Sequence, residues 1–292
     1  MENLRSARRT ETTPRRLYEQ SKRGDSWNPA RLDFSVDRAD WNRLDGEQRL
    51  PLLAAAVLAA NQARVQWHNS STLLMAIERR GPLEESLCYA SVVHEKARRI
   101  EFFELLLGDV IPVVGDPERF FQTHHRHFYT SRLPEVIDRL RVDLQESDLI
   151  EALTLDGPLA EGVLHRATSY LFRHTLEKLD VLPTTQQGLS RLEQATDRHL
   201  DLATFLIGEI LDESPELWET VDETMQSSFE PAVGMVREFY DRYSNIPVPR
   251  AEVVTYAVEQ FSQRYEQLEL SRTNRLDALE AASSFDDTPI PS

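Results

Sequence analysis

Residues 159–172, LAEGVLHRATSYLF, contain the feature from which the rest of the sequence can be interpreted. Glu161, Leu164, Thr168 and Leu171 follow one another at intervals of three or four, the spacing of one helix face. A face of this kind normally packs into a protein core, but this one begins with a glutamate. Because glutamate is almost never fully buried without a partner, the stretch predicts a core-facing helix whose carboxylate has a specific role.

Three further segments carry inward-facing stripes with the same spacing. The first comprises Leu52, Ala56, Ala59, Ala63, Trp67, Ser70 and Leu74. The second comprises Leu87, Ser91, Glu95, Arg98, Phe102 and Leu105. The third comprises Leu189, Leu192, Thr196, His199, Ala203, Leu206 and Ile210. Four long amphipathic helices, with no strand-like alternation between them, predict an all-α bundle.

Turn and cap signals divide the chain. Helices are expected at about 46–80, 82–108, 186–212 and 250–282, and Asp156-Gly157-Pro158 predicts a break just before Glu161. Residues 1–25 are polar and basic and are expected to be mobile. Residues 26–282 are expected to form a single helical domain, with the bundle at about 46–212, and residues 283–292 a loose tail.

Composition narrows the class of protein. The 292-residue chain has one cysteine, Cys88, which excludes disulfide scaffolds and cysteine-held metal clusters within one chain. No apolar run is long enough for a membrane span and no secretory signal is evident, so a cytoplasmic location is expected. The net charge of −16 argues against nucleic-acid and anionic-membrane partners.

Lysine is rare in this chain. Only Lys22, Lys96 and Lys178 occur among its 33 cationic residues. An acidic, lysine-poor composition favours a halophilic source. A high-GC genome is the alternative, but it explains only the preference for arginine.

The charged residues on the predicted inner faces suggest a metal centre that has been altered. Bundles that hold two iron or manganese ions take single glutamates from two helices and a Glu-x-x-His pair from each of the other two. Here Glu95-Lys-Ala-Arg98 has only the glutamate of such a pair, and Thr196-Asp-Arg-His199 has only the histidine. Glu161 fits a single-helix ligand, while Ala63 occupies the matching place on the first helix.

Four motifs together resemble one protein family. They are WNPARLDFSVDRADW (27–41), VVHEKARRIEFF (92–103), LAEGVLHRATSYLF (159–172) and ATDRHLDLATFLIG (195–208). The sequence resembles the ribonucleotide reductase small-subunit superfamily, and most closely its ligand-binding oxidase branch. The resemblance implies a ferritin-like four-helix bundle with additional wrapping helices and a homodimer. It also implies a manganese/iron or di-iron centre with a long-chain fatty acid beside it.

Carried over by position, the resemblance places six metal ligands at 63, 95, 98, 161, 196 and 199. Glu95, Glu161 and His199 match the expected ligand types, whereas Ala63, Arg98 and Thr196 do not. The positions of the Val–Tyr crosslink found in the oxidase branch are occupied by Gln66 and Asp156.

Two interpretations of this site follow. In the first, Glu95, Arg98, Glu161, Thr196 and His199 form a buried ion-pair network that needs no metal cofactor. In the second, Glu95, Glu161 and His199 hold a single metal, or near neighbours complete a rearranged Mn/Fe site. Those neighbours are His68, His94, His165 and Asp197.

The function predicted from these observations is that of a pseudoenzyme. We expect a ferritin-like homologue that has lost its di-metal centre and acts as a fatty-acid-like ligand binder or a structural or regulatory dimer. The alternative is an active metal-dependent oxidoreductase with a reduced site. Two other features are assigned ordinary roles: His124, His125 and His127 as a surface cluster, and Cys88 as a small core residue.

Overall fold

The computed structural model describes residues 13–23 and 27–283, with residues 273–283 described as backbone only. Every secondary-structure element in these ranges is a helix, which confirms the all-α prediction. The predictions for residues 1–12, 24–26 and 284–292, which include most of the predicted tail, fall outside the described ranges.

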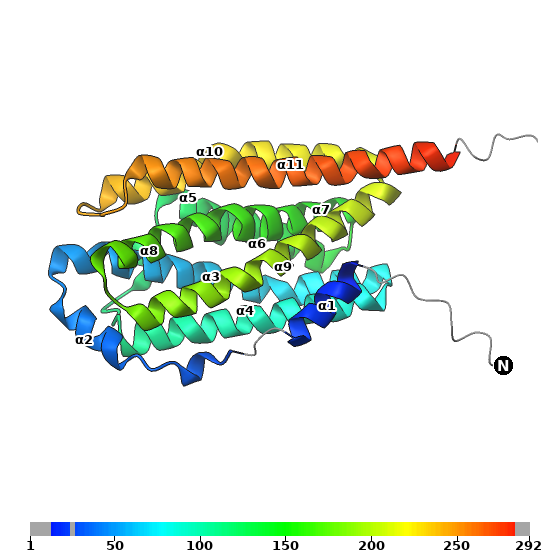
Figure 1. Cartoon of the computed structure of the whole chain (residues 1–292). Helices are drawn as coiled ribbons and strands as arrows, with labels where there is room; N and C mark the ends of the chain where they lie inside the picture. The colour runs from blue at the N-terminus through cyan, green and yellow to red at the C-terminus, as the bar shows by residue number, and fades with distance from the viewer. Residues whose placement is uncertain (1–12, 24–26, 284–292) are drawn as a thin grey trace, which may run out of the picture.

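The central bundle is built from α3 (Gly46–Arg80), α4 (Leu83–Asp109), α9 (Pro183–Glu213) and one composite helix. The composite helix runs through α7 (Glu146–Thr154), η4 (Leu155–His165) and α8 (Arg166–Leu179) without interruption. Figure 1 shows these helices running lengthwise along the molecule. The predicted limits of the long helices agree with the structure to within a few residues.

Further helices cover the bundle. On one side lie α10 (Trp218–Arg242) and α11 (Arg250–Ser283), which form a pair along the top of Figure 1. The connection between α4 and α7 contains η2 (Pro117–Phe120), α5 (Thr123–Arg126), η3 (His127–Arg132) and α6 (Leu133–Val142). Three short elements complete the fold: η1 (Pro29–Arg31), α2 (Ser35–Arg43) and η5 (Pro215–Leu217).

The start of the described chain differs from expectation. Residues 13–23, assigned from the sequence to a mobile segment, form helix α1 (Thr13–Arg23), which packs beside α4 and α9. Leu17 anchors this helix, since its side chain is only 2% exposed and belongs to the hydrophobic core. The polar composition of the segment concealed this anchor and the neighbouring Tyr18, which packs against the same core.

The predicted break at Asp156-Gly157-Pro158 is wrong. Residues 155–165 form a π-helix, whose wide turns accommodate Pro158 although it lacks an amide hydrogen to donate. Gly157 also permits a close approach to α9, because an added Cβ would lie 2.5 Å from the Cβ of Ala203. Glu161 therefore lies inside a continuous helix rather than in the first turn after a break, and its side chain is fully buried.

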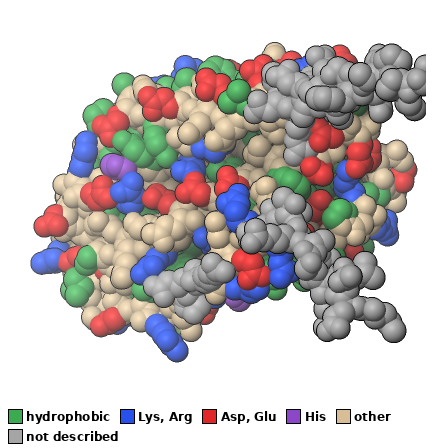
Figure 2. Space-filling model, turned by 45° about the vertical axis from the view of Figure 1, so that its right-hand side comes forward, with side chains coloured by type: hydrophobic (Ala, Val, Ile, Leu, Met, Phe, Trp, Pro, Cys, Tyr) green, Lys and Arg blue, Asp and Glu red, His purple; other side chains and the backbone are tan. Residues whose placement is uncertain are grey.

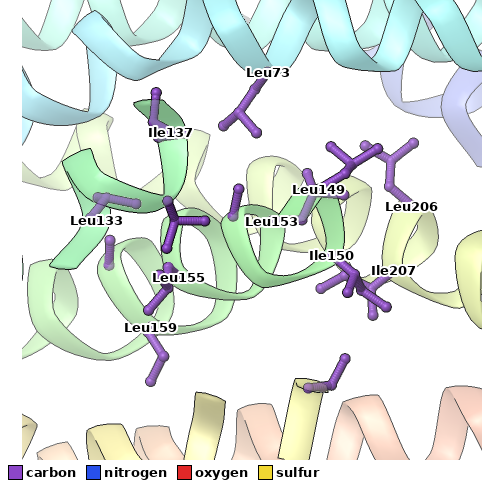
Figure 3. Close-up of a cluster of buried hydrophobic side chains, with 14 of the residues drawn as sticks. Leu73, Leu133, Ile137, Leu149, Ile150, Leu153, Leu155, Leu159, Leu206 and Ile207 are labelled. Atoms are coloured by element: carbon purple, nitrogen blue, oxygen red, sulfur yellow. The ribbon is translucent and has the colours of Figure 1, made fainter. Parts of the chain in front are cut away.

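Two apolar clusters fill the interior. One gathers residues from α3, α6, α7, η4 and α9, including Leu73, Ile137, Leu149, Leu155 and Leu206, which point toward one another in Figure 3. The other lies toward the opposite end of the bundle and contains Phe34, Phe102 and Phe172. Along α3, α4 and α9 the two clusters are separated by a short run of buried polar residues, where the candidate site lies.

The outer surface carries charges of both signs. Figure 2 shows acidic and basic side chains interspersed over one face of the molecule. The halophilic origin inferred from composition stays a prediction. No helix among the described residues is long and apolar enough to cross a lipid bilayer.

Gly188 provides a test of how tightly α9 packs on α4. A Cβ at this position would lie 2.1 Å from Cε2 of Phe102, a ring that is itself completely buried. We expect Gly188→Ala to lower the free energy of unfolding by about 1–3 kcal/mol, because the ring has no space into which it can move. Chemical denaturation measures the change.

Gly108 is the matched control, because a Cβ there would meet nothing within 4 Å. Gly108→Ala should be neutral or should stabilise the protein by up to about 1 kcal/mol, as alanine does elsewhere in helices. Equal effects of the two substitutions would contradict the packing described here.

Candidate functional site

Arg99 lies at the centre of the polar run and contacts all the helices of the bundle. Its Nη1 donates to both carboxylate oxygens of Glu161, at 2.8 and 2.9 Å, and lies 3.3 Å from Oε1 of Gln66. Its Nη2 donates to the hydroxyl oxygen of Thr196 at 3.2 Å. Arg99 belongs to α4, Gln66 to α3, Glu161 to η4 and Thr196 to α9, so one guanidinium joins four helices.

The partners of Arg99 are themselves fixed by the backbone. Thr196 donates its hydroxyl proton to the carbonyl oxygen of Leu192, which leaves the hydroxyl oxygen free to accept from Arg99. The amide group of Gln66 donates to the carbonyl oxygen of Asp156 at 3.4 Å while its own oxygen faces Arg99. The acceptors around the guanidinium are therefore oriented in advance.

A second buried ion pair lies next to the first. Lys96, one turn before Arg99 on α4, places its Nζ 2.6 Å from Oδ2 of Asp156. The side chains are 2% and 7% exposed, respectively. Burial raises the pKa of Asp156, and Lys96 lowers it again only in part. The site thus contains two cationic side chains, Lys96 and Arg99, and two acidic side chains, Asp156 and Glu161.

The two acidic groups differ in their protonation behaviour. Burial alone would raise the pKa of Glu161, but the Arg99 guanidinium and His199 outweigh that effect and hold the pKa well below its usual range. Glu161 is therefore a carboxylate at neutral pH. It is the acceptor that keeps Arg99 in place.

Two histidines adjoin Glu161. Nδ1 of His199 lies 3.7 Å from Oε1 of Glu161, which is longer than a hydrogen bond. Burial lowers the pKa of His199, and it lowers the pKa of His165 to about 3, with Arg99 acting in the same direction at both rings. Both imidazoles are therefore neutral, so they add no further positive charge beside Arg99.

A small cavity of about 20 Å³ lies against the second ion pair. Lys96, Asp156, Glu161, His199 and Tyr89 contribute to its wall. The Tyr89 hydroxyl and Oδ1 of Asp156 have no hydrogen-bond partner among the described residues. The cavity has room for a water molecule between these groups, but none for an acyl chain.

Arg98 does not enter this site, and its assignment to the buried network is corrected. Its Nη1 donates to Oε1 of Glu95 at 2.9 Å, at the edge of the bundle, where Arg198 also approaches Glu95 at 4.0 Å. The buried face of α4 passes through Cys88, Val92, Lys96, Arg99 and Leu106. Glu95 and Phe102 of the predicted stripe are buried as well, so the buried face is wider than the stripe and includes Lys96 and Arg99 but not Arg98.

Of the predicted site residues, the structure brings Glu161, Thr196 and His199 together and leaves Glu95 and Arg98 as a separate pair. Ala63 is buried but offers no ligand atom. Trp67, predicted to face inward, is 46% exposed, and its neighbour Gln66 is the buried residue. On α3 the prediction therefore fails at Trp67 and holds at Ala63 and Ser70, which are buried.

The other candidate ligands lie apart from the site, with one exception. His68 and His94 are exposed, and Asp197 is exposed and pairs with Arg166. Only His165 is buried next to Glu161, and its Nε2 lies 3.4 Å from the hydroxyl of Ser169. Cys88 is buried, as expected for a core residue, and burial raises the pKa of its thiol to about 12.

The donor set does not fit a di-metal centre. In the part of the chain that the structure describes, no three His, Cys, Asp or Glu side chains are placed to hold one metal ion. Both oxygens of Glu161 face the guanidinium of Arg99, and two of the six ligand positions carry Ala63 and Thr196. Arginine cannot deprotonate to make room for a cation.

No protein-family model matches the sequence. The fold, however, matches solved structures closely. One R2-like ligand-binding oxidase variant with an anaerobically reconstituted Mn/Fe cofactor has a TM-score of 0.83 and 24% identity, over 92% of this chain and 97% of that chain. The chain has the fold of the R2-like ligand-binding oxidases.

Two further solved structures have the same fold. An R2-like ligand-binding oxidase with an aerobically reconstituted Mn/Fe cofactor has a TM-score of 0.83 at 24% identity and covers 89% of this chain and 93% of that one. A third, also a point variant with a Mn/Fe cofactor, reaches 0.84 at 25% identity over 88% and 93%. The predicted ferritin-like fold and the resemblance to the oxidase branch are confirmed by these similarities.

Sequence reasoning missed Lys96 and Arg99, although the sequence held a signal for both. Tyr89, Val92, Phe103 and Leu106 form an apolar face at helical spacing, and Lys96 and Arg99 lie on it. The predicted stripe through Ser91 and Arg98 has fewer large apolar members. Choosing the more apolar face would have placed Arg99 in the core.

Arg99 and Arg98 are adjacent arginines in different environments, so they provide a matched pair. We expect Arg99→Ala to lower the free energy of unfolding by about 3–5 kcal/mol, because it leaves the Glu161 carboxylate buried without its cation. Arg98→Ala should cost less, about 1 kcal/mol, since Arg98 is partly exposed and Arg198 also approaches the Glu95 carboxylate. Equilibrium denaturation of both variants measures the difference.

A double variant separates the ion pair from general loss of packing. Arg99→Met combined with Glu161→Met removes both buried charges and should recover part of the stability lost in Arg99→Ala. Similar losses for Arg98→Ala and Arg99→Ala would show that the buried ion pair is not where the structure places it.

Proposed function

We propose that this protein is a metal-independent relative of the ligand-binding oxidases, which keeps the helical bundle and acts as a ligand-binding or regulatory dimer rather than an oxidoreductase. The observation that carries the proposal is the position of Arg99. Its guanidinium faces both oxygens of Glu161, a carboxylate at a position where the resemblance places a metal ligand.

Electrostatics supports this proposal. Two unit charges about 4 Å apart interact by about 4 kcal/mol at an effective dielectric constant of 20, and a divalent ion doubles that value. A metal ion beside Arg99 would meet this repulsion. It would also have to share the Glu161 carboxylate with Arg99.

Charge balance supports it as well. Arg99 and Glu161 neutralise each other, and Lys96 stands beside Asp156. In a di-metal bundle, the metal ions neutralise the carboxylates. Here the side chains of α4 supply that positive charge, so the centre is balanced without a cofactor.

The second candidate is an active metal-dependent oxidoreductase, with a mononuclear or rearranged Mn/Fe site. It is favoured by the Mn/Fe cofactors of the similar structures. For it to hold, Arg99 would have to leave Glu161, and Glu95 would have to turn inward from Arg98. The two candidates therefore differ in whether the Arg99–Glu161 pair persists.

The long-chain fatty acid implied by the resemblance stays a prediction. The cavity beside the ion pairs, at about 20 Å³, does not support an acyl chain at that point. We propose that ligand binding takes place elsewhere in the bundle.

Metal content tests the proposal directly. We expect protein purified in high salt without chelator, then incubated with Mn(II) and Fe(II) in air, to retain far less than one metal per chain by elemental analysis. Retention of one metal per chain would favour the mononuclear site, and retention of two would show that the argument from Arg99 is wrong.

A variant with the ligand positions rebuilt serves as the control. Ala63→Glu, Arg98→His and Thr196→Glu, combined with Arg99→Leu, supply the missing ligand types and remove the central cation. This protein should take up more metal than the unmodified chain under the same conditions. Circular dichroism establishes that its helices are intact.

We further propose that the homodimer implied by the resemblance forms through the face of α3 and α4. Two adjoining hollows of about 460 and 610 Å³ share Arg64, Ile100 and Glu104 there, and Trp67 lines the larger one while remaining 46% exposed. An exposed apolar surface of this kind is typical of an interaction site.

Light scattering tests the assembly. We expect a mass of two chains for the unmodified protein, and a shift toward one chain in Trp67→Glu because a buried interface would then contain an unpaired charge. Leu270→Glu is the matched control, since Leu270 is an exposed apolar residue on α11. A single-chain mass for the unmodified protein would exclude the dimer.

A further inference from the structure

The contact between Lys96 and Asp156 joins two helices inside the bundle. Lys96 belongs to α4, and Asp156 belongs to the π-helix η4, 60 residues further along the chain. Nζ of Lys96 lies 2.6 Å from Oδ2 of Asp156, and the two side chains are 2% and 7% exposed. Because a carboxyl C–O bond is about 1.2 Å long, Nζ lies within about 4 Å of the carboxyl carbon, Cγ. An amine is therefore held against a carboxyl group where little water reaches.

Burial makes the charged form of such a pair costly. The penalty for removing two charges from water can exceed the attraction between them. Transfer of one proton from Nζ to the carboxyl group gives a neutral amine beside a neutral acid, which are the reactants of amide formation. A neutral lysine amine is a nucleophile. Two groups fixed in contact can react as if one were present at about 10⁵–10⁸ M, so the fold supplies the proximity that this reaction lacks in solution.

The second carboxyl oxygen, Oδ1 of Asp156, lies in a cavity wall that also contains a free donor. Neither Oδ1 nor the Tyr89 hydroxyl has a hydrogen-bond partner among the described residues, and both residues line the cavity of about 20 Å³. Burial and then the charge of Asp156 raise the pKa of Tyr89 well above its usual range, so the hydroxyl keeps its proton. A donor of this kind stabilises the negative charge that develops on a carbonyl oxygen when a nucleophile adds to the carbon.

The same cavity has room for the product that has to leave. Lys96, Asp156 and Tyr89 all contribute to its wall, and its volume is that of about one water molecule. The site therefore holds a nucleophile, a carboxyl carbon and an unpaired hydrogen-bond donor around a space of the size of one water.

We propose that Lys96 and Asp156 condense to an isopeptide bond, an amide that joins Nζ to Cγ. The Nζ–Cγ bond forms and the Cγ–Oδ2 bond breaks. Of the three protons of the ammonium group, one remains on the amide nitrogen and two leave with Oδ2 as water. Oδ1 becomes the amide oxygen and accepts from the Tyr89 hydroxyl. The reaction consumes no oxidant, reductant or other reactant.

The bond ties α4 to the composite helix beside the Arg99–Glu161 pair. Like a disulfide, it stabilises the fold mainly by restricting the unfolded chain. One positive and one negative charge disappear together, so the centre stays balanced. The inference is independent of the metal content of the protein, because the Arg99–Glu161 pair is the same with or without the amide.

Mass spectrometry of the denatured full chain tests the proposal. We expect the chain to be lighter than its sequence requires by the mass of one water. Trypsin should leave Lys96 uncut and release residues 81–98 joined to residues 142–166 as one fragment. Lys22 is the internal control, since it lies 2.7 Å from Glu19 but its side chain is 47% exposed. It should remain uncoupled and open to trypsin.

The digest also separates the isopeptide bond from a second reaction with the same mass change. Asp156 precedes Gly157, and an Asp-Gly pair can lose water by closing a succinimide ring. The ring leaves the two fragments separate and Lys96 open to trypsin. Either an intact mass equal to that of the sequence, or a lost water with separate fragments, would overturn the proposal.

Lys96→Arg provides the matched variant, because it keeps the positive charge and removes the reactive amine. Its intact mass should equal that of its own sequence. A variant that is also lighter by one water would place the reaction elsewhere in the chain and overturn the assignment to Lys96.

Tyr89→Phe tests the part assigned to the hydroxyl. Because that hydroxyl is unpaired, its removal should leave the helices intact, while the joined fragment accumulates at least about tenfold more slowly after synthesis of the chain. Tyr129→Phe is the control, since Tyr129 has an equally buried and unpaired hydroxyl but is not part of this cavity wall. Equal rates in the two variants would show that Tyr89 does not assist the reaction.

Discussion

The contact between Arg99 and Glu161 is the interaction on which the arrangement of the bundle depends. A buried guanidinium has five N–H donors and no means of losing its charge, so each surrounding helix has to present an acceptor at the right height. Gln66, Glu161 and Thr196 supply acceptors to its two terminal nitrogens from three different helices. Sliding any one helix by a turn would leave both a charge and an acceptor without partners, so the pair fixes the register of all four.

The same interaction explains why the core is divided. Leucine and phenylalanine clusters fill the two ends of the bundle, and each alone has the composition of an ordinary hydrophobic core. Apolar packing tolerates many side-chain combinations, whereas a polar layer tolerates few. The two ends therefore contribute most of the burial, and the layer between them selects one arrangement among those that burial would allow.

Much of this architecture could be predicted from sequence, because helix limits depend on local signals. Asp45 and Gln48 form a capping box at the start of α3, and Gly81, with φ of 118°, ends it, as the sequence indicates. Orientation about the helix axis was harder to predict. On α4 the charged residues at 95, 96, 98 and 99 are close in sequence, and only the packing of neighbouring helices decides which of them face inward.

Pro158 shows a second limit of predicting structure from the sequence. Proline is correctly associated with helix interruption, but the π-helical turns of η4 keep the chain helical across it. A π-helix is a response to tertiary packing, here the close approach of Gly157 to Ala203, and has no strong local signature. The burial of His125 was likewise not predicted, because a run of histidines at 124, 125 and 127 is usually a surface feature, whereas His125 is 1% exposed.

The ion-paired centre also has an evolutionary consequence. A chain that acquired metal ligands one at a time would pass through intermediates with a buried carboxylate or guanidinium lacking its partner, each several kcal/mol less stable. The free energy of unfolding of a natural domain is only about 5–15 kcal/mol. Few such steps would therefore leave the domain folded. Ala63, Arg99 and Thr196 would have to change almost together. Under the metal-independent function proposed above, gradual selection would therefore be opposed at this centre, while the rest of the fold remains free to diverge.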